Sequence, residues 1–183
     1  MQKKTYTVCV FCGSKSGNNI KYLKLANTLG KKLAERKFNV IYGGGNSGLM
    51  GALAEGVLSK NGSLISVIPK FFKNKIDIIK SKKEIITEDL FDRKKIMIKN
   101  SDIFIALPGG FGTLDEIFEL IALNQLSLIN KKIIILDINN FWYSLKSLIK
   151  DLKKSGFLYN DKNNNIIFKN SISKVIGFIE DSF

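Results

Sequence analysis

The sequence predicts an α/β fold: a single Rossmann-like domain in which helices cover both faces of a doubly wound, mainly parallel sheet. Short apolar runs alternate with helix-length segments, which is typical of strands joined by crossover helices. The runs at residues 103–107 and 133–136 are apolar at every position, as expected of parallel strands buried on both faces. A length of 183 residues is that of one domain, so we expect residues 1–183 to form a single unit.

The elements follow from this alternation, because consecutive apolar residues predict buried strands and longer mixed segments predict helices. In chain order we predict a strand at 6–11, a helix at 18–37, a strand at 39–42, a helix at 49–60, strands at 63–68 and around 84–86, a helix at 89–100, a strand at 103–107, a helix at 113–126, a strand at 132–137, a helix at 141–154, a turn at 160–165 and a helix at 171–183. Ligands of such sheets bind where the strands end, so the loops after Phe11, Tyr42, Ile68 and Leu107 are the ones to examine.

The net charge of +13 invites a nucleic-acid function, but the pattern of basic residues argues against it. Only two of the 29 basic residues are arginines, Arg36 and Arg93, and the lysines are scattered along the chain. No block interleaves basic and aromatic residues as a single-strand binding surface would. We therefore expect no nucleic-acid partner, although a positive field would attract a small anionic substrate.

Membrane insertion and secretion are not expected either. No apolar run approaches the roughly 18 uninterrupted residues of a membrane span. The N-terminal segment leads directly into the first predicted strand and lacks the small-residue cleavage site of a secretory signal. We therefore expect a cytoplasmic protein without a membrane partner.

Cys9 and Cys12 form a Cys-x-x-Cys pair, a spacing found in redox and zinc sites. Side chains alternate across a strand, so residues three apart point to opposite faces. The chain has no histidine and no second pair of cysteines to complete a zinc site. We expect neither a metal site nor a redox function for this pair.

Three of the loops at the expected binding edge are rich in glycine. They span residues 12–17, 42–51 and 108–113, and each opens a predicted helix. Glycine lets backbone N–H groups approach an anion, and a helix N-terminus favours negative charge. The loops therefore predict a phosphate or nucleotide site, with Ser14, Gly44 and Gly45 as binding residues from the first two loops.

Two sequence features that are missing argue against a dinucleotide and against a nucleoside triphosphate as the ligand. Gly43, Gly45 and Gly48 fit the G-x-G-x-x-G pattern of dinucleotide sites, but the next predicted strand ends at Pro69-Lys70 without the carboxylate that holds the ribose. The Walker pattern for nucleoside triphosphates is also absent. A nucleoside with a single phosphate fits this Rossmann-like nucleotide-binding domain better.

Acid–base chemistry must come from carboxylate, lysine, tyrosine or cysteine groups, because histidine is absent. Glu116 is expected in the first turn of the helix after the third glycine loop. Its structural alternative is a capping box over residues 113–116, in which Glu116 bonds back to the Thr113 N–H. Arg93 is the second candidate, since arginine supplies a planar fork that lysine cannot; Arg36, at a helix end, is expected to interact with the helix dipole.

Residues 108–116, Pro-Gly-Gly-Phe-Gly-Thr-Leu-Asp-Glu, resemble the P-G-G-x-G-T-x-x-E motif of the LOG (Lonely Guy) family. These are cytokinin riboside 5′-monophosphate phosphoribohydrolases, long mislabelled as lysine decarboxylases. The segment 93–97 matches the family's R-K-x-x-M element, and residues 139–142 resemble its segment after the next strand. The resemblance covers roughly residues 6 to 150.

The resemblance implies hydrolysis of the N-glycosidic bond of a nucleoside 5′-monophosphate, AMP or a cytokinin nucleotide, to free base and ribose 5-phosphate, without a cofactor. It implies that Arg93 and Glu116 are the catalytic pair. The substrate- and phosphate-binding residues that it implies are Lys94, Gly109, Gly110, Gly112 and Thr113. Glu116 would stabilise positive charge on the ribosyl carbon or orient the attacking water, by analogy with sugar hydrolases.

The family also implies a homodimer, and the largely apolar segment 114–126 suits burial against both the sheet and a partner subunit. A non-catalytic nucleotide or molybdenum-cofactor carrier is the alternative function, because such carriers resemble the family in fold and glycine loops. A lysine decarboxylase would need a pyridoxal-phosphate lysine, and no lysine is marked out as one. Base preference, higher assembly and physiological role (cytokinin biosynthesis or nucleotide salvage) stay open at this level.

Overall fold

The computed structural model describes residues 5–73, 77, 79, 81–158 and 165–183. Within them the strands are β1 (Thr7–Phe11), β2 (Asn39–Tyr42), β3 (Ser63–Pro69), β4 (Lys83–Thr87), β5 (Ile103–Ala106), β6 (Ile133–Leu136) and β7 (Ile166–Lys169). All pair in parallel in one sheet of order β4-β3-β2-β1-β5-β6-β7. The predicted parallel α/β fold is confirmed.

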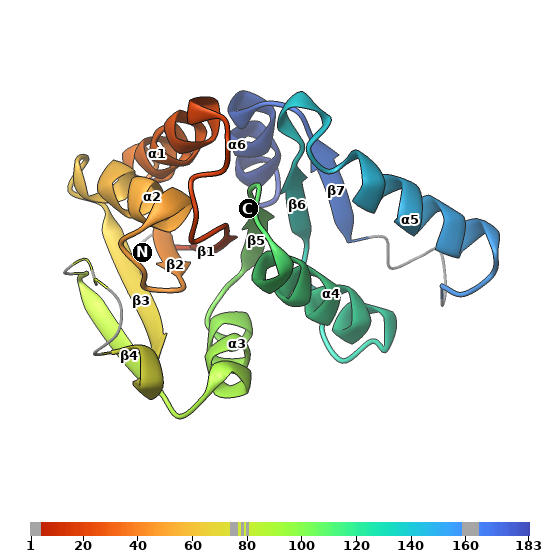
Figure 1. Cartoon of the computed structure of the whole chain (residues 1–183), viewed down its shortest axis with the longest axis horizontal. Helices are drawn as coiled ribbons and strands as arrows, with labels where there is room; N and C mark the ends of the chain where they lie inside the picture. The colour runs from red at the N-terminus through yellow and green to blue at the C-terminus, as the bar shows by residue number, and fades with distance from the viewer. Residues whose placement is uncertain (1–4, 74–76, 78, 80, 159–164) are drawn as a thin grey trace.

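Helices cover both faces of this sheet (Figure 1). They are α1 (Ile20–Glu35), α2 (Gly48–Leu58), α3 (Leu90–Lys99), α4 (Phe111–Gln125), α5 (Tyr143–Lys154) and α6 (Ile172–Glu180), with single 3₁₀ turns η1 (Lys70–Phe72) and η2 (Ile138–Asn140). Alternate side chains of β1 divide the core into two clusters: Val8 and Val10 pack with α1, α2 and α6, whereas Cys9 and Phe11 pack with α3, α4 and α5. The doubly wound arrangement is therefore confirmed.

The sheet changes direction of winding at β1. The chain builds β2, β3 and β4 outward on one side of β1, and then returns to place β5 on its other side, with Val8 paired to Ile103. The loops that leave β1 and β5 consequently lie side by side, and the Gly13 N–H donates to the Pro108 carbonyl at 3.1 Å. Open α/β sheets bind their ligands at this kind of switch point.

The seventh strand, β7, was not predicted from the sequence. Residues 166–169, between the expected turn and the last helix, pair in parallel with β6, with Ile133 opposite Ile166 and Leu136 opposite Lys169. This edge strand is only half-buried along its whole length, and its apolar run Ile166–Phe168 is a strand pattern that the prediction left unassigned. Residues 160–164 of the predicted turn lie outside the described part of the chain.

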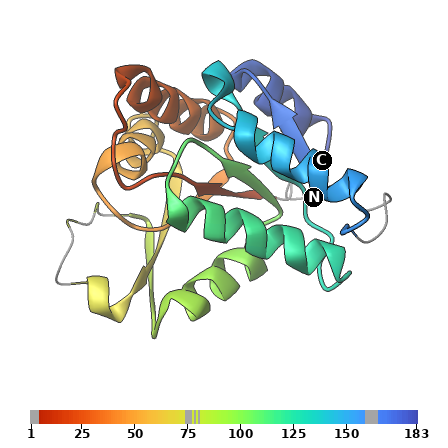
Figure 2. The same cartoon turned by 45° about the vertical axis from the view of Figure 1, so that its right-hand side comes forward.

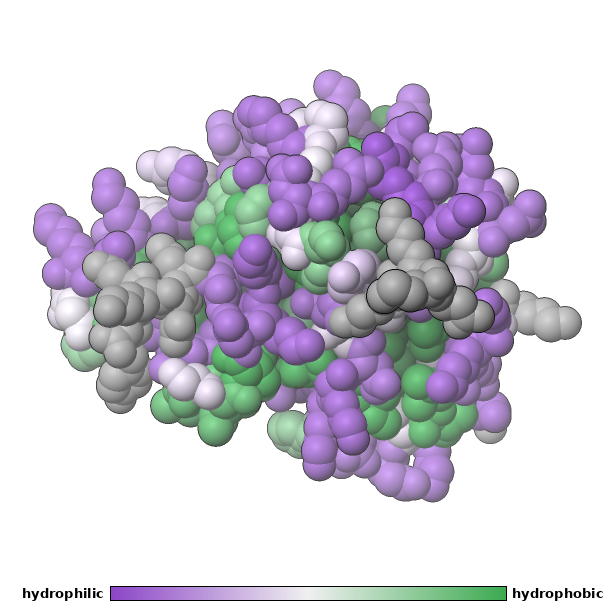
Figure 3. Space-filling view, turned by 180° about the vertical axis from the view of Figure 1, so that it is seen from behind, coloured by the Kyte–Doolittle hydropathy of each residue, from purple (hydrophilic) through white to green (hydrophobic). Residues whose placement is uncertain are grey.

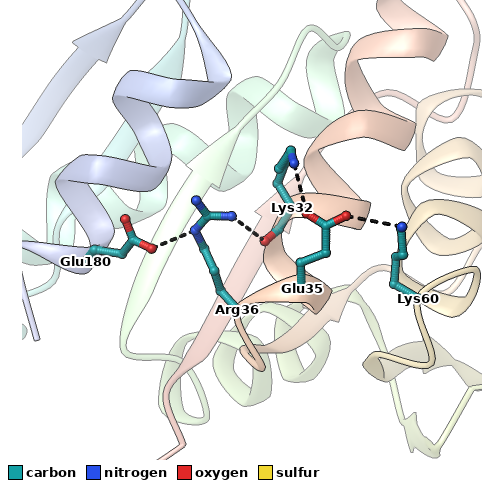
Figure 4. Close-up of polar contacts among 5 residues, drawn as sticks. All are labelled: Lys32, Glu35, Arg36, Lys60 and Glu180. Atoms are coloured by element: carbon teal, nitrogen blue, oxygen red, sulfur yellow. Dashed lines mark hydrogen bonds and ion pairs between the residues drawn. The ribbon is translucent and has the colours of Figure 1, made fainter.

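Arg36 is the C-cap residue of α1, and Figure 4 shows it between Glu180 and the Lys32 backbone. Its Nη1 donates to the Lys32 carbonyl at 3.4 Å, which confirms a contact with the helix end, and its Nε donates to Glu180 of α6 at 2.6 Å. Glu35 accepts from Lys32 at 2.9 Å and pairs with Lys60 at 3.3 Å. Each such exposed ion pair contributes about 0–1 kcal/mol to the free energy of unfolding. The network therefore stabilises the contacts among α1, α6 and the end of α2 only modestly.

Hydrophilic residues cover most of the face seen in Figure 3, and hydrophobic residues form separate patches between them. Among the helices in the described ranges, none combines the length and apolar composition needed to cross a membrane.

Helices α1 and α2 pack closely because glycines lie at their contact. A Cβ at Gly30 would lie 2.3 Å from the Leu53 carbonyl oxygen, and one at Gly56 would lie 2.1 Å from the Asn27 carbonyl oxygen. Backbone atoms cannot yield as a flexible side chain can. The two helices can therefore approach this closely only without side chains at these positions.

We predict that Gly30→Ala lowers the free energy of unfolding by roughly 1–3 kcal/mol, because overpacking forces α1 away from α2. The matched control is Gly177→Ala in α6, where a Cβ would meet nothing within 4 Å. This variant should be neutral or more stable by about 0.5–1 kcal/mol, since alanine favours the helix. Urea unfolding of both variants measures the difference, and equal stabilities would contradict the close-packing argument.

Candidate active site

A cavity of about 950 Å³ opens at the carboxyl edge of the sheet, over the ends of β1 and β5. The loops that follow β1, β2 and β5 all line it, as predicted from the three glycine-rich segments. The turn after β3 adds Phe72, and helices α1, α3 and α4 add Tyr22, Arg93 and Glu116. The cavity thus gathers segments from across most of the chain.

Two helices point their N-termini at this cavity without a side-chain cap. Gly110 is the N-cap residue of α4, and it has no side chain to offer. Ser47 is the N-cap residue of α2, but its hydroxyl donates to the Ser14 carbonyl at 3.1 Å instead of capping the helix. In α2 the Leu49 N–H already donates to the Gly13 carbonyl at 3.0 Å. The remaining N–H groups at helix starts that no side chain caps, with the partial positive charge of the helix dipole, are suited to binding an anion.

The structure brings together most of the predicted binding residues. Those that line the cavity are Ser14, Gly45, Gly109, Gly110, Gly112 and Thr113. Gly109 has a steric reason to be glycine, because a Cβ there would lie 2.1 Å from Thr113 Oγ1 and 3.0 Å from the Gly13 nitrogen. The two loops can thus approach each other closely at the cavity wall.

Two of the predicted binding residues do not line the cavity. Gly44 has a φ of +85°, and a Cβ there would lie 2.2 Å from Ile68 Cγ1 in β3, so its glycine serves the turn and the packing beneath it. Lys94 points instead between α3 and α4, where its ammonium pairs with Asp115 at 2.9 Å and Glu119 at 2.7 Å. Sequence spacing could not separate these two residues from their cavity-lining neighbours.

Arg93 of α3 and Glu116 of α4 form an ion pair at the cavity wall. Arg93 Nη2 donates to Glu116 Oε1 at 2.6 Å, and the two side chains are only 15% and 8% exposed. The guanidinium lies over Gly43, where a Cβ would be 3.4 Å from Nη1. Arg93 Nε is buried without a hydrogen-bond partner among the described residues, a donor of the kind that a ligand or a water satisfies.

The capping-box alternative for Glu116 is wrong. Helix α4 begins at Phe111, two residues before the predicted start, so Thr113 lies within the helix and Gly110 occupies the N-cap position. Glu116 is therefore in the second turn, and its carboxylate accepts from Arg93.

Burial raises the pKa of Glu116 from 4.5 to about 7. The positive charge of Arg93 opposes this rise, the negative charge of Asp115 adds to it, and Lys94 opposes it again. A carboxyl group that titrates near neutral pH within a cavity can exist in both protonation states under ordinary conditions. This is the range in which a carboxyl group is useful for acid–base and charge-stabilising chemistry.

An apolar and aromatic wall completes the cavity, and the sequence analysis assigned none of its residues to the site. Its members include Tyr22, Met50, Leu90, Phe111 and Phe141. The rings of Tyr22 and Phe141 meet edge to face with centroids 5.6 Å apart. Phe141 could have been suspected from the family-like segment 139–142, whereas Tyr22 lies within a predicted helix and carries no such sign.

Cys9 and Cys12 point to opposite faces of the sheet, as predicted. Cys9 lies in the core cluster with α3, α4 and α5, and Cys12 lies in the other one. Both are buried thiols without a disulfide, and burial raises the pKa of each. In the described part of the chain, no group of three or more histidine, cysteine, aspartate or glutamate residues is arranged to hold a metal ion.

The chain matches one family model and is similar to several known proteins. A family model described as "Possible lysine decarboxylase" matches residues 50–178. The chain is 35% identical over 182 residues to the cytokinin riboside 5′-monophosphate phosphoribohydrolase LOG1 of Arabidopsis thaliana, over 99% of this chain and 85% of that protein. It is 38% identical over 160 residues to the probable phosphoribohydrolase of the same type LOGL9 of Oryza sativa subsp. japonica, over 86% of this chain and 70% of that protein.

Among solved structures, the molybdenum cofactor carrier protein from Chlamydomonas reinhardtii superposes with a TM-score of 0.75. The alignment covers 97% of this chain and 98% of the carrier, but the sequences are only 19% identical. This similarity shows a shared fold.

The raised pKa of Glu116 predicts a pH dependence of stability. Between pH 4.5 and about 7 the folded protein keeps a proton on Glu116 that the unfolded chain has lost, so this group lowers the free energy of unfolding as pH rises. Glu116→Gln removes this dependence. The unfolding free energy of the variant relative to wild type should therefore rise by up to about 3 kcal/mol from pH 4.5 to 8. Urea titrations across this range measure it, and a constant difference would contradict the raised pKa.

Proposed function

Since the chain belongs to the family of the cytokinin riboside 5′-monophosphate phosphoribohydrolases, we propose that it hydrolyses the N-glycosidic bond of a nucleoside 5′-monophosphate. The products are the free base and ribose 5-phosphate. The observation that carries the proposal is the buried Arg93–Glu116 pair, which lies in the same cavity as the uncapped starts of α2 and α4. An anion site and a reactive carboxylate are thus within one substrate-sized space.

In the proposed complex the 5′-phosphate binds to the backbone N–H groups at the start of α4, beside Gly109 and Thr113. The C1′–N bond then breaks and the ribosyl carbon becomes cation-like, while the electron pair goes to the base, which takes a proton from the solvent. The Glu116 carboxylate stabilises this positive charge and accepts a proton from the water whose oxygen bonds to C1′. Preorganised charge of this type is worth on the order of 10²–10³ in rate.

Arg93 has two effects on this chemistry. Its hydrogen bond at 2.6 Å fixes the orientation of the Glu116 carboxylate. Its charge also opposes the effect of burial on the Glu116 pKa, and so keeps more of the carboxylate ionised at neutral pH. We therefore expect the rate to rise with pH through about 7, as Glu116 loses its proton.

The aromatic and apolar wall supports a purine as the base. Flat rings pack well against tyrosine and phenylalanine side chains such as Tyr22 and Phe141. Adenine and an N6-prenylated adenine share this ring and differ in an apolar tail. Comparing the turnover of AMP, GMP, CMP and isopentenyl-AMP determines which nucleotide is preferred.

The residues of the cavity do not fit pyridoxal phosphate, the cofactor that a lysine decarboxylase would use. Such a site needs a lysine for the Schiff base and a partner for the ring nitrogen. Among the described cavity-lining residues the one lysine is Lys15 and the one acidic residue is Glu116, whose carboxylate is paired with Arg93. A carrier function, by contrast, would use the anion site and leave the carboxylate without a role.

We predict that Glu116→Gln folds but loses about 10²–10³-fold in the release of adenine from AMP, because the amide cannot stabilise the ribosyl cation. Arg93→Lys should lose activity as well, since the ammonium lacks the planar fork. Glu55→Gln, an exposed glutamate on α2, is the control and should keep full activity. Chromatography of free adenine gives the readout; binding of AMP by the wild type without base release would favour the carrier.

We also propose that the protein is a homodimer that uses the outer surfaces of α3 and α4. Exposed large apolar side chains gather on and beside these helices: Phe91, Phe118, Leu126 and Leu128. Exposed large apolar side chains of this type are typical of subunit contacts. This surface adjoins the wall that carries Arg93 and Glu116.

Phe118→Glu is predicted to convert the dimer to a monomer, because a carboxylate would be buried without a partner in the contact. Leu148→Glu, which changes a comparably exposed apolar residue on α5, should leave the dimer intact. Sedimentation equilibrium of the two variants and the wild type measures the mass. A monomeric wild type, or equal behaviour of the variants, would contradict this interface.

A further inference from the structure

Beside the Arg93–Glu116 pair lies a second, separate set of charges between α3 and α4, which run next to each other (Figure 2). Lys94 follows Arg93 on α3, and its ammonium lies 2.9 Å from Asp115 and 2.7 Å from Glu119 of α4. The Lys94 side chain is only 8% exposed, and it does not line the cavity. The reaction proposed above gives this buried cation no role.

We propose that Lys94 is a positioning residue for the hydrolysis: by holding Asp115 and Glu119, it leaves the Arg93 guanidinium to Glu116. The inference rests on the proposed function, and it assigns Lys94 a role other than contact with the substrate.

The positions of the three carboxylates on α4 explain why Arg93 and Lys94 need different partners. Asp115 precedes Glu116 directly, and Glu119 follows Glu116 by three residues, a spacing that places two side chains on the same side of a helix. Two consecutive cations of α3 thus meet three carboxylates of α4: Glu116 pairs with Arg93, and Asp115 and Glu119 pair with Lys94. A guanidinium forms strong forked bonds with any carboxylate in reach, so the two extra ones would compete with Glu116 unless another cation held them.

Burial of the ammonium supports this role. A charge taken out of water is tolerated only where partners compensate it, and here two carboxylates do so. The Phe91 ring lies 5.5 Å from the ammonium and covers it further. Lys94 is thus held firmly and cannot reach a ligand without losing both ion pairs.

The charges around Glu116 also depend on Lys94. The groups that act on Glu116 are Arg93 and Lys94 from α3, Asp115 on its own helix, the Cys9 thiol of β1 and the Cys12 thiol just after β1. Glu119, three residues further along α4, is paired with Lys94. Lys94 lowers the pKa of Glu116 and Asp115 raises it. Loss of the Lys94 charge removes one of the two lowering effects and leaves Arg93 alone to oppose Asp115 and burial. The ionised form of Glu116 would then require a higher pH.

The test compares Lys94→Met with Lys94→Arg and with Lys95→Met, a control at an exposed lysine of the same helix. With AMP as substrate, we expect Lys94→Met to lower kcat about 10–100-fold with KM changed less than about twofold, because orientation and not binding is lost. The acid limb of its kcat/KM profile should move to higher pH. Lys94→Arg should restore most of the activity, and Lys95→Met should match wild type.

Two further measurements test the role of Lys94 even if Lys94→Met does not fold or AMP is not hydrolysed. If Lys94→Met does not fold, Asp115→Asn removes a charge that raises the Glu116 pKa, and should move the acid limb to lower pH. Titration of the Glu116 carboxyl by ¹³C NMR in wild type and variant needs no turnover, so it tests the electrostatic coupling even if AMP is not hydrolysed. A raised KM with unchanged kcat in Lys94→Met, or unchanged titration of Glu116, would overturn the proposal; absence of base release by wild type would overturn the proposed function alone.

Discussion

The side-by-side placement of β1 and β5 is the constraint on which the site depends. The two strands pair in parallel over four residues, and their following loops are joined by the Gly13–Pro108 hydrogen bond. This pairing places the first and third glycine loops against each other. It also sets the course of α3, which leads into β5, and of α4, which leaves it. The anion site and the carboxylate therefore come together through one feature of sheet order.

Charged side chains are buried in the contact between α3 and α4. Arg93, Lys94 and Glu116 are all largely buried there, although charged side chains are rarely buried without partners. Each cation has a carboxylate within 2.9 Å. The arrangement leaves the Glu116 carboxyl with a pKa near neutral, which neither burial alone nor pairing alone would produce. The stability of this contact and the chemistry of the cavity thus share the same residues.

Much of the fold was predictable because the core strands are strongly patterned. Strands such as Ile133–Leu136 are apolar at each position, and the segment Asn39–Tyr42 has the bounds that were predicted. The half-buried edge strand Ile166–Lys169 was not predicted, although its apolar run of Ile166, Ile167 and Phe168 is a strand pattern that the sequence does contain. The start of α4 was misplaced because Thr113 looks like a cap, whereas Gly110, which has no side chain, occupies the N-cap position.

By itself the sequence determined the parallel sheet, the edge at which the cavity opens, the separation of Cys9 from Cys12 and the prediction that Arg93 and Glu116 share one site, because each follows from local pattern, residue chemistry or a family motif. Only the tertiary structure decided that Arg93 bonds to Glu116, that Lys94 bonds to other carboxylates, and that Tyr22 and Phe141 share one wall. These are contacts between segments distant in the chain. Their partners depend on the angle and spacing at which α3 meets α4, which packing fixes and no local spacing encodes.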